Sequence, residues 1–557
     1  MEAYIRESAL NVTALAGPYL ESLTGLDVEE QRVWVQERQS DILVGIAATT
    51  VVAYLVKSLV GYALSFRAPI VGYRHWLEPG WLVGLRFGFD ATPMIREGYA
   101  RFKDGYFKVR RNDDDVLIIP RHHVNDLRNV HETKLSGMDA HMRNMLAEYT
   151  FGNMHMMETS DLHRRVIIRK LNPLLGTLVP ALKDELDYAV GVLDQLSGPK
   201  AWEWTPQGID DLTVGLVSRI SARIFVGPEL CRNDEWLYLS VHYTENLGWT
   251  RNMLRLFPKI TRPVAALCMR SYWGIYRNLA AAQRLLRPII AARRDGVKND
   301  PAGYQKPNDF LQWMLDDARP DEAHPNDMAH RQLIVAMAAI HTTSMSVSHF
   351  IYDLCAHPEY ITPLREEIIQ TIREDGGVKK TTLNKLRLMD SFLKESQRLN
   401  PPLRIVKTPL TLRDGVKIPV GTHIAIASDA VSHDAACLPG GGDPAAFDPF
   451  RYARLREDEA NKNRYQFATT DEMNLHFGHG LYACPGRFFA SIEAKLILMH
   501  LLIMCDFKFR DGDTRPANLS FEEACYPDPS FRVLMRRRVI PEKDISDLIL
   551  GSSGGAL

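Results

Sequence analysis

The stretch FGHGLYACPGRFFA, residues 477–490, places one cysteine, Cys484, between a glycine-rich loop and a segment of helical character. Pro485 suits the first position of a helix, because its missing N–H would be unpaired there in any case. Apolar residues recur downstream at helical spacing, so we expect a helix that starts near Cys484 and has one buried face. The dipole and free N–H groups of a helix N-terminus favour a thiolate, which makes this sulfur a candidate metal ligand or nucleophile.

Three glycines surround the cysteine. Gly478, Gly480 and Gly486 let the backbone turn tightly and leave one face of the loop free of side chains. A flat, bulky group lying against the loop would need such a face, and Phe477 would pack beside it.

Other interpretations of the cysteine remain open from the residues alone. A buried free thiol is the most ordinary one. Zinc is a second, because His476 and His479 would join Cys484 as ligands, although no fourth ligand is placed nearby. A cysteine nucleophile with a histidine base is a third, but nothing marks which of the 18 histidines would serve.

The same residues carry a family resemblance. Phe477, Gly480, Cys484 and Gly486 match the haem-binding signature F-x-x-G-x-x-x-C-x-G of the cytochrome P-450 monooxygenases. The resemblance, which spans roughly residues 68–540, implies a mainly α fold with a minor β region. It also implies a bound haem b whose iron takes Cys484 as its axial ligand, with Phe477, Gly480 and Gly486 lining the cofactor.

Two further motifs follow the order of the family. KESQRLNPP supplies Glu395 and Arg398, three positions apart on one helix face, and FDPFRY supplies Arg451. By the resemblance, these three residues form a buried network that braces the cysteine loop.

A long apolar helix is expected at Leu333–Leu354, with polar residues at its middle. On a structural interpretation, the Thr342 hydroxyl bonds back to the carbonyl of Ala338. By the resemblance, AAIHTT is the oxygen-activation stretch and Thr342 its catalytic threonine. His341 stands where an acid is usual, and it either passes protons itself or holds water while Thr342 acts.

The resemblance leaves the partners of the haem propionates open. Tyr482 stands where the family usually has arginine or histidine. Arg404, His163 and Arg165 occupy roughly matching regions, as does Arg169, and at least one cation among them is expected to bind a propionate.

The totals exclude some partners and suggest others. The 557 residues carry 67 Lys+Arg against 68 Asp+Glu, a balance that gives no reason to expect nucleic acid. Seven scattered cysteines without a C-x-x-C pair indicate reduced thiols. Residues 42–64 are apolar apart from Lys57 and long enough to cross a bilayer as one helix, with a buried core helix as the alternative. A cleaved signal peptide fits less well, because some forty mostly polar residues come first.

The expected organisation therefore has five parts. Residues 1–41 form a polar, lumenal segment with a glycosylation sequon at Asn11, 42–64 the transmembrane anchor, 65–82 a hinge, 83–540 the haem-thiolate monooxygenase domain and 541–557 a flexible tail. Within the domain we expect an early hairpin at 106–120, helices from about 126 to 399, strands at 408–428 and a strand near the end in SFRVLMRRRV.

Taken together, the resemblance implies an endoplasmic reticulum enzyme, single-pass and with a cytosolic catalytic domain. It would insert oxygen from dioxygen into a small apolar molecule, a terpenoid or meroterpenoid of secondary metabolism. Electrons would come from NADPH through a separate cytochrome P-450 reductase, with cytochrome b5 as a second candidate donor. The alternatives are a reductase-independent haem-thiolate enzyme, such as a peroxygenase or isomerase, and a non-enzymatic membrane-held protein that binds zinc or haem.

Overall fold

The computed structural model describes residues 65–540, except 132–136, 153–154, 401–404, 408–409, 412–413 and 420–421, together with residues 44, 48, 49 and 52. Residues 68–557 form one compact unit, separate from residues 1–67. The predicted lumenal segment with Asn11, nearly all of the predicted anchor and the predicted tail lie outside the described residues.

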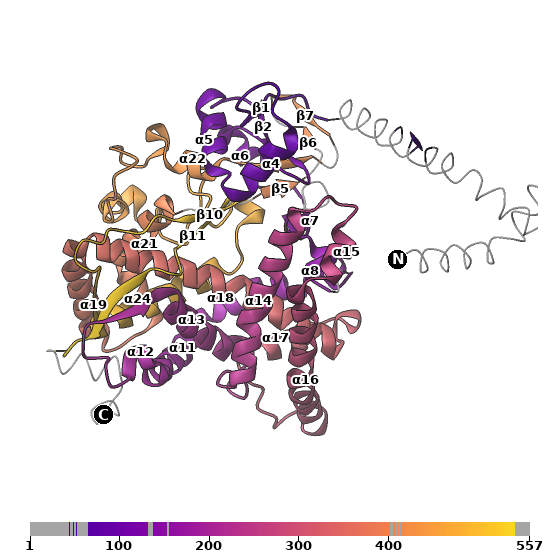
Figure 1. The fold of residues 1–557 in the computed structure, drawn as a ribbon. Coiled ribbons are helices and arrows are strands. Elements are labelled where there is room, and N and C mark those ends of the chain that lie inside the picture. Colours follow the sequence, from indigo (N-terminus) through magenta and orange to yellow (C-terminus); the bar gives the residue numbers. More distant parts are fainter. Residues whose placement is uncertain are drawn as a thin grey trace, which may run out of the picture. The chain divides into compact units, whose positions relative to one another are not determined.

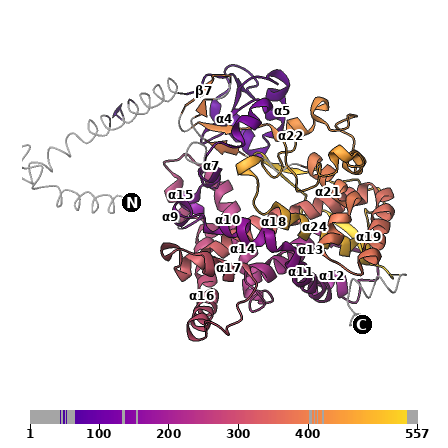
Figure 2. The ribbon, with the colours of Figure 1, turned by 180° about the vertical axis from the view of Figure 1, so that it is seen from behind.

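A five-stranded sheet dominates the β region, in the order β1-β2-β3-β8-β5. The expected hairpin is confirmed, because β2 (Phe107–Arg110) and β3 (Asp115–Ile118) pair antiparallel, with Phe107 opposite Ile118. Parallel pairing then joins β3 to β8 (His423–Ala425), and β5 (Ile405–Lys407) closes the edge. The indigo start of the domain therefore lies beside its orange strands, some three hundred residues later, as both views show (Figures 1 and 2).

The segment predicted as a hinge contains regular structure. β1 (Ile70–Val71) pairs with β2, and α4 (Gly80–Phe89) begins directly after Pro79. α4 and α5 (Thr92–Arg101) pack against β2 through side chains such as Val83 and Phe87. Much of 65–82 thus belongs to the folded unit.

Long helices make up the rest of the domain. The principal ones are α11 (Asn172–Val192), α13 (Ile209–Phe225), α14 (Asp234–Arg255), α16 (Arg270–Asn299), α18 (Pro325–Ala356), α21 (Arg387–Leu399) and α24 (Arg487–Met504). Shorter ones are α6 (Val124–Leu127), α7 (Gly137–Asn144), α8 (Ala147–Thr150), α9 (His155–Thr159), α10 (Leu162–Val166), α12 (Asp194–Ser197), α15 (Arg262–Leu267), α17 (Phe310–Asp317), α19 (Ile361–Asp375), α20 (Lys380–Lys385), α22 (Ser428–Ser432) and α23 (Arg451–Leu455).

α18 is the central helix and packs against α13, α14, α16, α21 and α24. It contains the predicted helix at 333–354 and extends it at both ends. Among the described residues it is the helix long and apolar enough to cross a membrane, yet 61% of its most apolar window is buried inside the domain. Its hydrophobicity is explained by its place in the core.

Three small β elements complete the fold. β12 (Arg532–Arg537), the strand expected near the end, pairs with β4 (Thr205–Gly208) and β9 (Cys505–Lys508). β10 (Leu519–Phe521) and β11 (Ala524–Tyr526) form a hairpin, and β6 (Leu410–Thr411) pairs with β7 (Lys417–Ile418). The prediction of a mainly α domain with a minor β region is confirmed.

Candidate active site

Two glycines shape the loop that carries Cys484. Gly478 and Gly480 have φ of 71° and 63°, in the left-handed region that favours glycine. A Cβ on Gly480 would lie 2.1 Å from the carbonyl oxygen of Arg128, and the N–H of Leu481 donates to that same oxygen at 2.8 Å. Only glycine lets the loop lie this close to the segment at 128–130.

The loop is also closed on itself. The backbone N–H of Cys484 donates to the carbonyl oxygen of Phe477 at 2.6 Å. Tyr482, which stands where the family usually has a cation, donates its hydroxyl to the carbonyl of Val130. The Cys484 side chain is half-buried.

The helix after the cysteine begins later than expected. α24 starts at Arg487 with Gly486 as its N-cap, so the placing of Pro485 at the first helical position was wrong. Pro485 and Gly486 form a turn instead, and Asn172 of α11 donates its side-chain N–H to the Pro485 carbonyl at 3.0 Å. The two turn residues thus separate the sulfur from the helix end.

A buried ion network stands beside this loop. Arg398 donates two hydrogen bonds to the carboxylate of Glu395, both at 2.9 Å, and both side chains are buried. Arg451 lies 3.6 Å from the same carboxylate. Arg398 also donates to the carbonyls of Ser432, Pro444 and Ala446, and Glu395 accepts the N–H of Asp448. The network fastens α21 to the segment that precedes the cysteine loop.

The middle of α18 is accessible although the turns that flank it are buried. Ala338 and Thr342 are exposed, and Ala339, His341 and Ser346 are half-buried, whereas the turns on either side are buried almost completely. The Thr342 hydroxyl donates to the carbonyl of Ala338 at 2.7 Å, the back-bond of the structural interpretation. Its oxygen keeps lone pairs that are free to accept a proton donor.

His341 turns toward a neighbouring helix. Its Nε2 lies 3.3 Å from the carbonyl oxygen of Val241 in α14, so this nitrogen carries a hydrogen and donates it. Asp210 of α13 is near enough to interact with His341 electrostatically, and burial raises the pKa of that carboxyl. His341 therefore links α18 to α14 and faces an acid on α13.

The candidate propionate partners differ in what they already bind. Arg165 donates to Asp161, Asp317 and Glu322, so a cofactor carboxylate would compete with three others. His163 is buried beside Arg331, and burial together with that charge lowers its pKa to about 4, which keeps the ring neutral. Arg169 is exposed, and Arg404 lies outside the described residues.

Sequence reasoning missed one cation at this place. Arg164, beside His163 in α10, donates to the carbonyl of Leu481 in the cysteine loop at 2.8 Å. Its position next to the expected residues was the available signal, but the sequence did not show which of the adjacent arginines faces the loop.

The zinc interpretation finds no support in the described part of the chain. No group of three His, Cys, Asp or Glu side chains among those residues is arranged to hold a metal ion. His479 is instead bonded through Nδ1 to the Thr470 hydroxyl at 3.2 Å.

The residues present fit a flat cofactor bound through sulfur. A Cβ on Gly486 would meet nothing within 4 Å, so the turn after Cys484 offers a bare surface. The accessible stretch of α18, which carries small residues such as Ala338, offers a second open surface. A half-buried thiol, a bare loop and an open helix centre are what a thiolate-ligated haem requires.

Comparison with known proteins agrees with this site. The family model for cytochrome P-450 matches residues 130–535, so the chain belongs to the cytochrome P-450 family. A cytochrome P-450 monooxygenase of Emericella nidulans is 47% identical over 522 residues, covering 92% of this chain and 96% of the relative. One of Penicillium canescens is 44% identical over 503 residues, with coverage of 89% and 93%. The ent-kaurene oxidase of Gibberella intermedia is 41% identical over 482 residues, with coverage of 86% and 89%.

The family fixes the kind of chemistry. The protein is a monooxygenase that binds haem through a cysteine thiolate, receives electrons from a redox partner and acts on an apolar substrate.

Proposed function

We propose that Cys484 is the haem ligand of a fungal monooxygenase that hydroxylates a terpenoid or meroterpenoid. The observation that carries the proposal is the cysteine loop itself, where Gly480 fits against Arg128 and Gly486 leaves the surface beside the sulfur bare. Among the seven cysteines, Cys484 is the one that stands in the family signature.

The substrate class rests on the relatives. Three of them are named ent-kaurene oxidase, and ent-kaurene is a terpenoid hydrocarbon. The small and apolar residues at the open centre of α18, Met337, Ala338 and Ala339, suit a substrate of that kind.

Each group of residues has a part in holding the cofactor. Cys484 would ligate the iron, Phe477, Gly480 and Gly486 would line the side of the sulfur, and His163, Arg404 or Arg164 would bind the propionates. Arg165 is a less favourable propionate partner than these, because it already binds three carboxylates. The bound haem supplies the redox centre at which dioxygen is activated to attack a C–H bond.

Thr342 and His341 manage protons in this proposal. The Thr342 oxygen accepts a hydrogen bond from water at the open face of α18 while its own hydrogen is held by Ala338. Rotation about one side-chain bond turns the hydroxyl into a donor toward the same space. His341, which contacts Val241 of α14 and interacts electrostatically with Asp210, is the second residue proposed to handle protons.

Electrons would come from NADPH through a cytochrome P-450 reductase, with cytochrome b5 as a second donor, in the endoplasmic reticulum membrane. Residues 42–64 would be the anchor of the domain at 83–540. Two sets of exposed apolar side chains support contact with a membrane surface. Trp76, Leu77 and Trp81 follow the anchor in sequence, and Ile260 and Val264 stand at and beside α15.

Replacing Cys484 by serine tests the central claim. The reduced, carbon monoxide-treated parent is expected to show the red-shifted Soret band of thiolate ligation, and Cys484→Ser is expected to lose that band and the hydroxylation while the helical content persists. A parent-like band in Cys484→Ser would overturn the assignment. Product formation driven by hydrogen peroxide but not by NADPH and reductase would favour the peroxygenase alternative.

Removing residues 1–64 tests the anchor. The shortened protein is expected to leave the membrane fraction and still bind haem, because every proposed cofactor residue lies beyond that point. A folded product that stays with the membrane would show that the apolar surface of the domain suffices to hold it there.

A further inference from the structure

Lys394 is a buried lysine one residue before Glu395 in α21, with only 2% of its surface exposed. Its Nζ donates to the carbonyl oxygens of Gln466 and Thr469, at 3.0 and 3.1 Å. The side chain lies over the ring of Tyr452, 5.4 Å from its centre. The ammonium therefore binds the backbone of a short loop, residues 466–469, that lies more than seventy residues later in the sequence.

A second charged side chain of α21 binds the backbone of the same loop. The Asp390 carboxylate accepts the backbone N–H of Phe467 at 3.0 Å, and Lys495 and Arg456 form ion pairs with the same carboxylate. The backbone is thus fixed before, at and after Phe467. Tyr465, just upstream, has a left-handed φ of 58°, a strained conformation that persists only where the surroundings impose it.

Phe467 connects this fixed backbone to the cysteine loop. Its buried ring meets the ring of Phe477 edge-on, with centres 5.4 Å apart at 80°, and also packs against Phe350 of α18. Phe477 is the residue whose carbonyl accepts the N–H of Cys484. A continuous chain of contacts runs from Lys394 through Phe467 and Phe477 to the backbone of the cysteine.

We propose that Lys394 is a positioning residue for the cysteine ligand, acting through Phe467. It neither touches the cofactor surface nor belongs to the Glu395 network, and its contribution is to keep the Phe467 ring seated against Phe477. This inference rests on the proposed assignment of Cys484 as the haem ligand.

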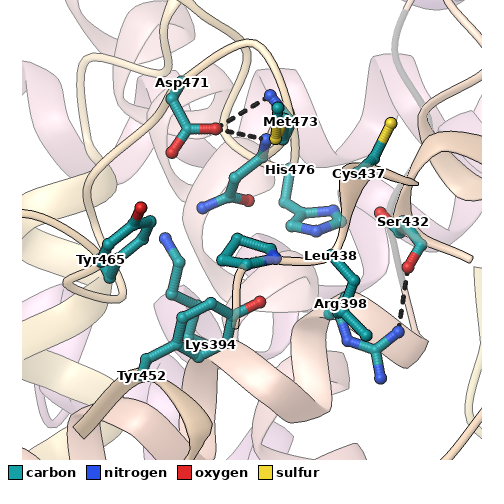
Figure 3. Close-up of a pocket in the computed structure, with 12 residues that line it drawn as sticks. Lys394, Arg398, Ser432, Cys437, Leu438, Tyr452, Tyr465, Asp471, Met473 and His476 are labelled. Carbon is teal, nitrogen blue, oxygen red and sulfur yellow. Dashed lines mark hydrogen bonds between the residues drawn. The ribbon is translucent and has the colours of Figure 1, made fainter. Parts of the chain in front are cut away.

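The two carbonyl contacts of Lys394 allow a sharp test. A small pocket lies beside it, lined by Tyr452, Tyr465 and His476 among others, and Figure 3 shows the Lys394 side chain among them. A guanidinium keeps the positive charge and presents several N–H donors, so Lys394→Arg can still donate to both carbonyl oxygens. Lys394→Met fills the same channel without a donor.

The experiment compares these variants in the haem-loaded protein by hydrogen exchange and by the reduced, carbon monoxide-treated spectrum. In Lys394→Met, amide exchange over 464–484 is expected to be at least about tenfold faster, as for the loss of charge-assisted hydrogen bonds, and part of the Soret band shifts away from the thiolate position. Lys394→Arg is expected to keep both the amide exchange over 464–484 and the Soret band close to those of the parent. Lys108→Met is the matched control, because Lys108 is also a buried lysine but lies in β2 of the sheet.

Three results would overturn the inference. One is parent-like exchange over 464–484 in Lys394→Met. Another is faster exchange spread evenly over the chain in Lys394→Met, as a loss of global stability gives and as Lys108→Met is expected to show. The third is a folded Lys394→Arg that does not restore the loop. A wrong assignment of Cys484 appears separately, as a thiolate band that survives Cys484→Ser, and leaves the exchange comparison intact.

Discussion

The N–H of Cys484 donates to the carbonyl oxygen of Phe477 across a loop that turns at Gly478 and Gly480. This bond fixes the backbone of the cysteine independently of what the sulfur binds. The thiol is therefore presented by a preformed loop, and changes that open the loop are expected to affect cofactor binding before they affect the helices around it.

Gly480→Ala is expected to disrupt this loop. Its left-handed φ and a Cβ placed against the Arg128 carbonyl together cost more than about 2 kcal/mol of unfolding free energy. Denaturant unfolding and haem content measure the effect. Gly486→Ala is the control, because its φ is −86° and its Cβ meets nothing within 4 Å, so its unfolding free energy should stay near that of the parent while its haem content falls. Equal stability of the two variants would contradict the steric argument.

Glu395→Gln is expected to lower the unfolding free energy by about 3–5 kcal/mol, because it leaves the buried Arg398 without a carboxylate and leaves Arg451 with the carboxylate of Asp448 alone. Haem content should fall with the fold. Glu459→Gln, which removes an exposed partner of Lys462, should change unfolding little. If both variants unfold alike in urea, the network does not brace the domain.

Glu493 of α24 gives the domain a pH dependence of known sign. The side chain is fully buried and accepts the Ser221 hydroxyl at 2.7 Å, and burial raises the pKa of its carboxyl from 4.5 to about 8. Between these pH values the unfolded chain loses a proton that the folded protein keeps, so stability falls as pH rises, by about 1.4 kcal/mol per pH unit.

Glu493→Gln removes this titration at nearly constant shape. The difference in unfolding free energy between the parent and Glu493→Gln, measured from pH 5 to pH 8, isolates this single group. The unfolding free energy of the parent should fall steadily over this range relative to that of Glu493→Gln. A difference that does not change with pH would show that Glu493 is ionised in the folded protein.

Thr342→Ala is expected to keep haem and substrate binding and to uncouple electron use from product formation. It removes the hydroxyl at the open centre of α18 together with its bonds back to the carbonyls of Ala338 and Ala339. The amounts of NADPH consumed, hydroxylated product and hydrogen peroxide give the coupling directly. His341→Ala distinguishes the role of His341 from that of Thr342. If it couples as well as the parent, the contact with Val241 is structural, and if Thr342→Ala stays fully coupled, Thr342 has no part in proton delivery.

The cysteine loop, the central helix and the family were predictable because their signals are local. Gly480, Cys484 and Glu395 stand in short motifs, and apolar residues dominate α18 on both sides of its polar middle. The residue at which the helix after Cys484 begins was less predictable. Pro485 is compatible with a first helical turn, but the contact of its carbonyl with Asn172, more than three hundred residues away, holds it in a turn.

The misses have the same cause. β4 and β9 were not predicted because each is only four residues long and becomes a strand by pairing with β12. β4 shows no alternation by itself, and β9 alternates but follows α24 directly. Lys394 was passed over because a lysine in a helix is ordinarily solvent-exposed, and its two carbonyl partners become visible only when the loop at 466–469 is folded against it.

The pairing of β3 with β8 sets the order in which this protein can be completed during translation. Ile118 leaves the ribosome some three hundred residues before its partner Ala425, an interval of roughly 15–60 s at ordinary rates of synthesis. During that time the β2–β3 hairpin exposes an unpaired edge, and β4 waits still longer for β12. The cysteine loop emerges between these two closures, so haem capture and the sealing of both sheets fall within the last quarter of the chain's synthesis.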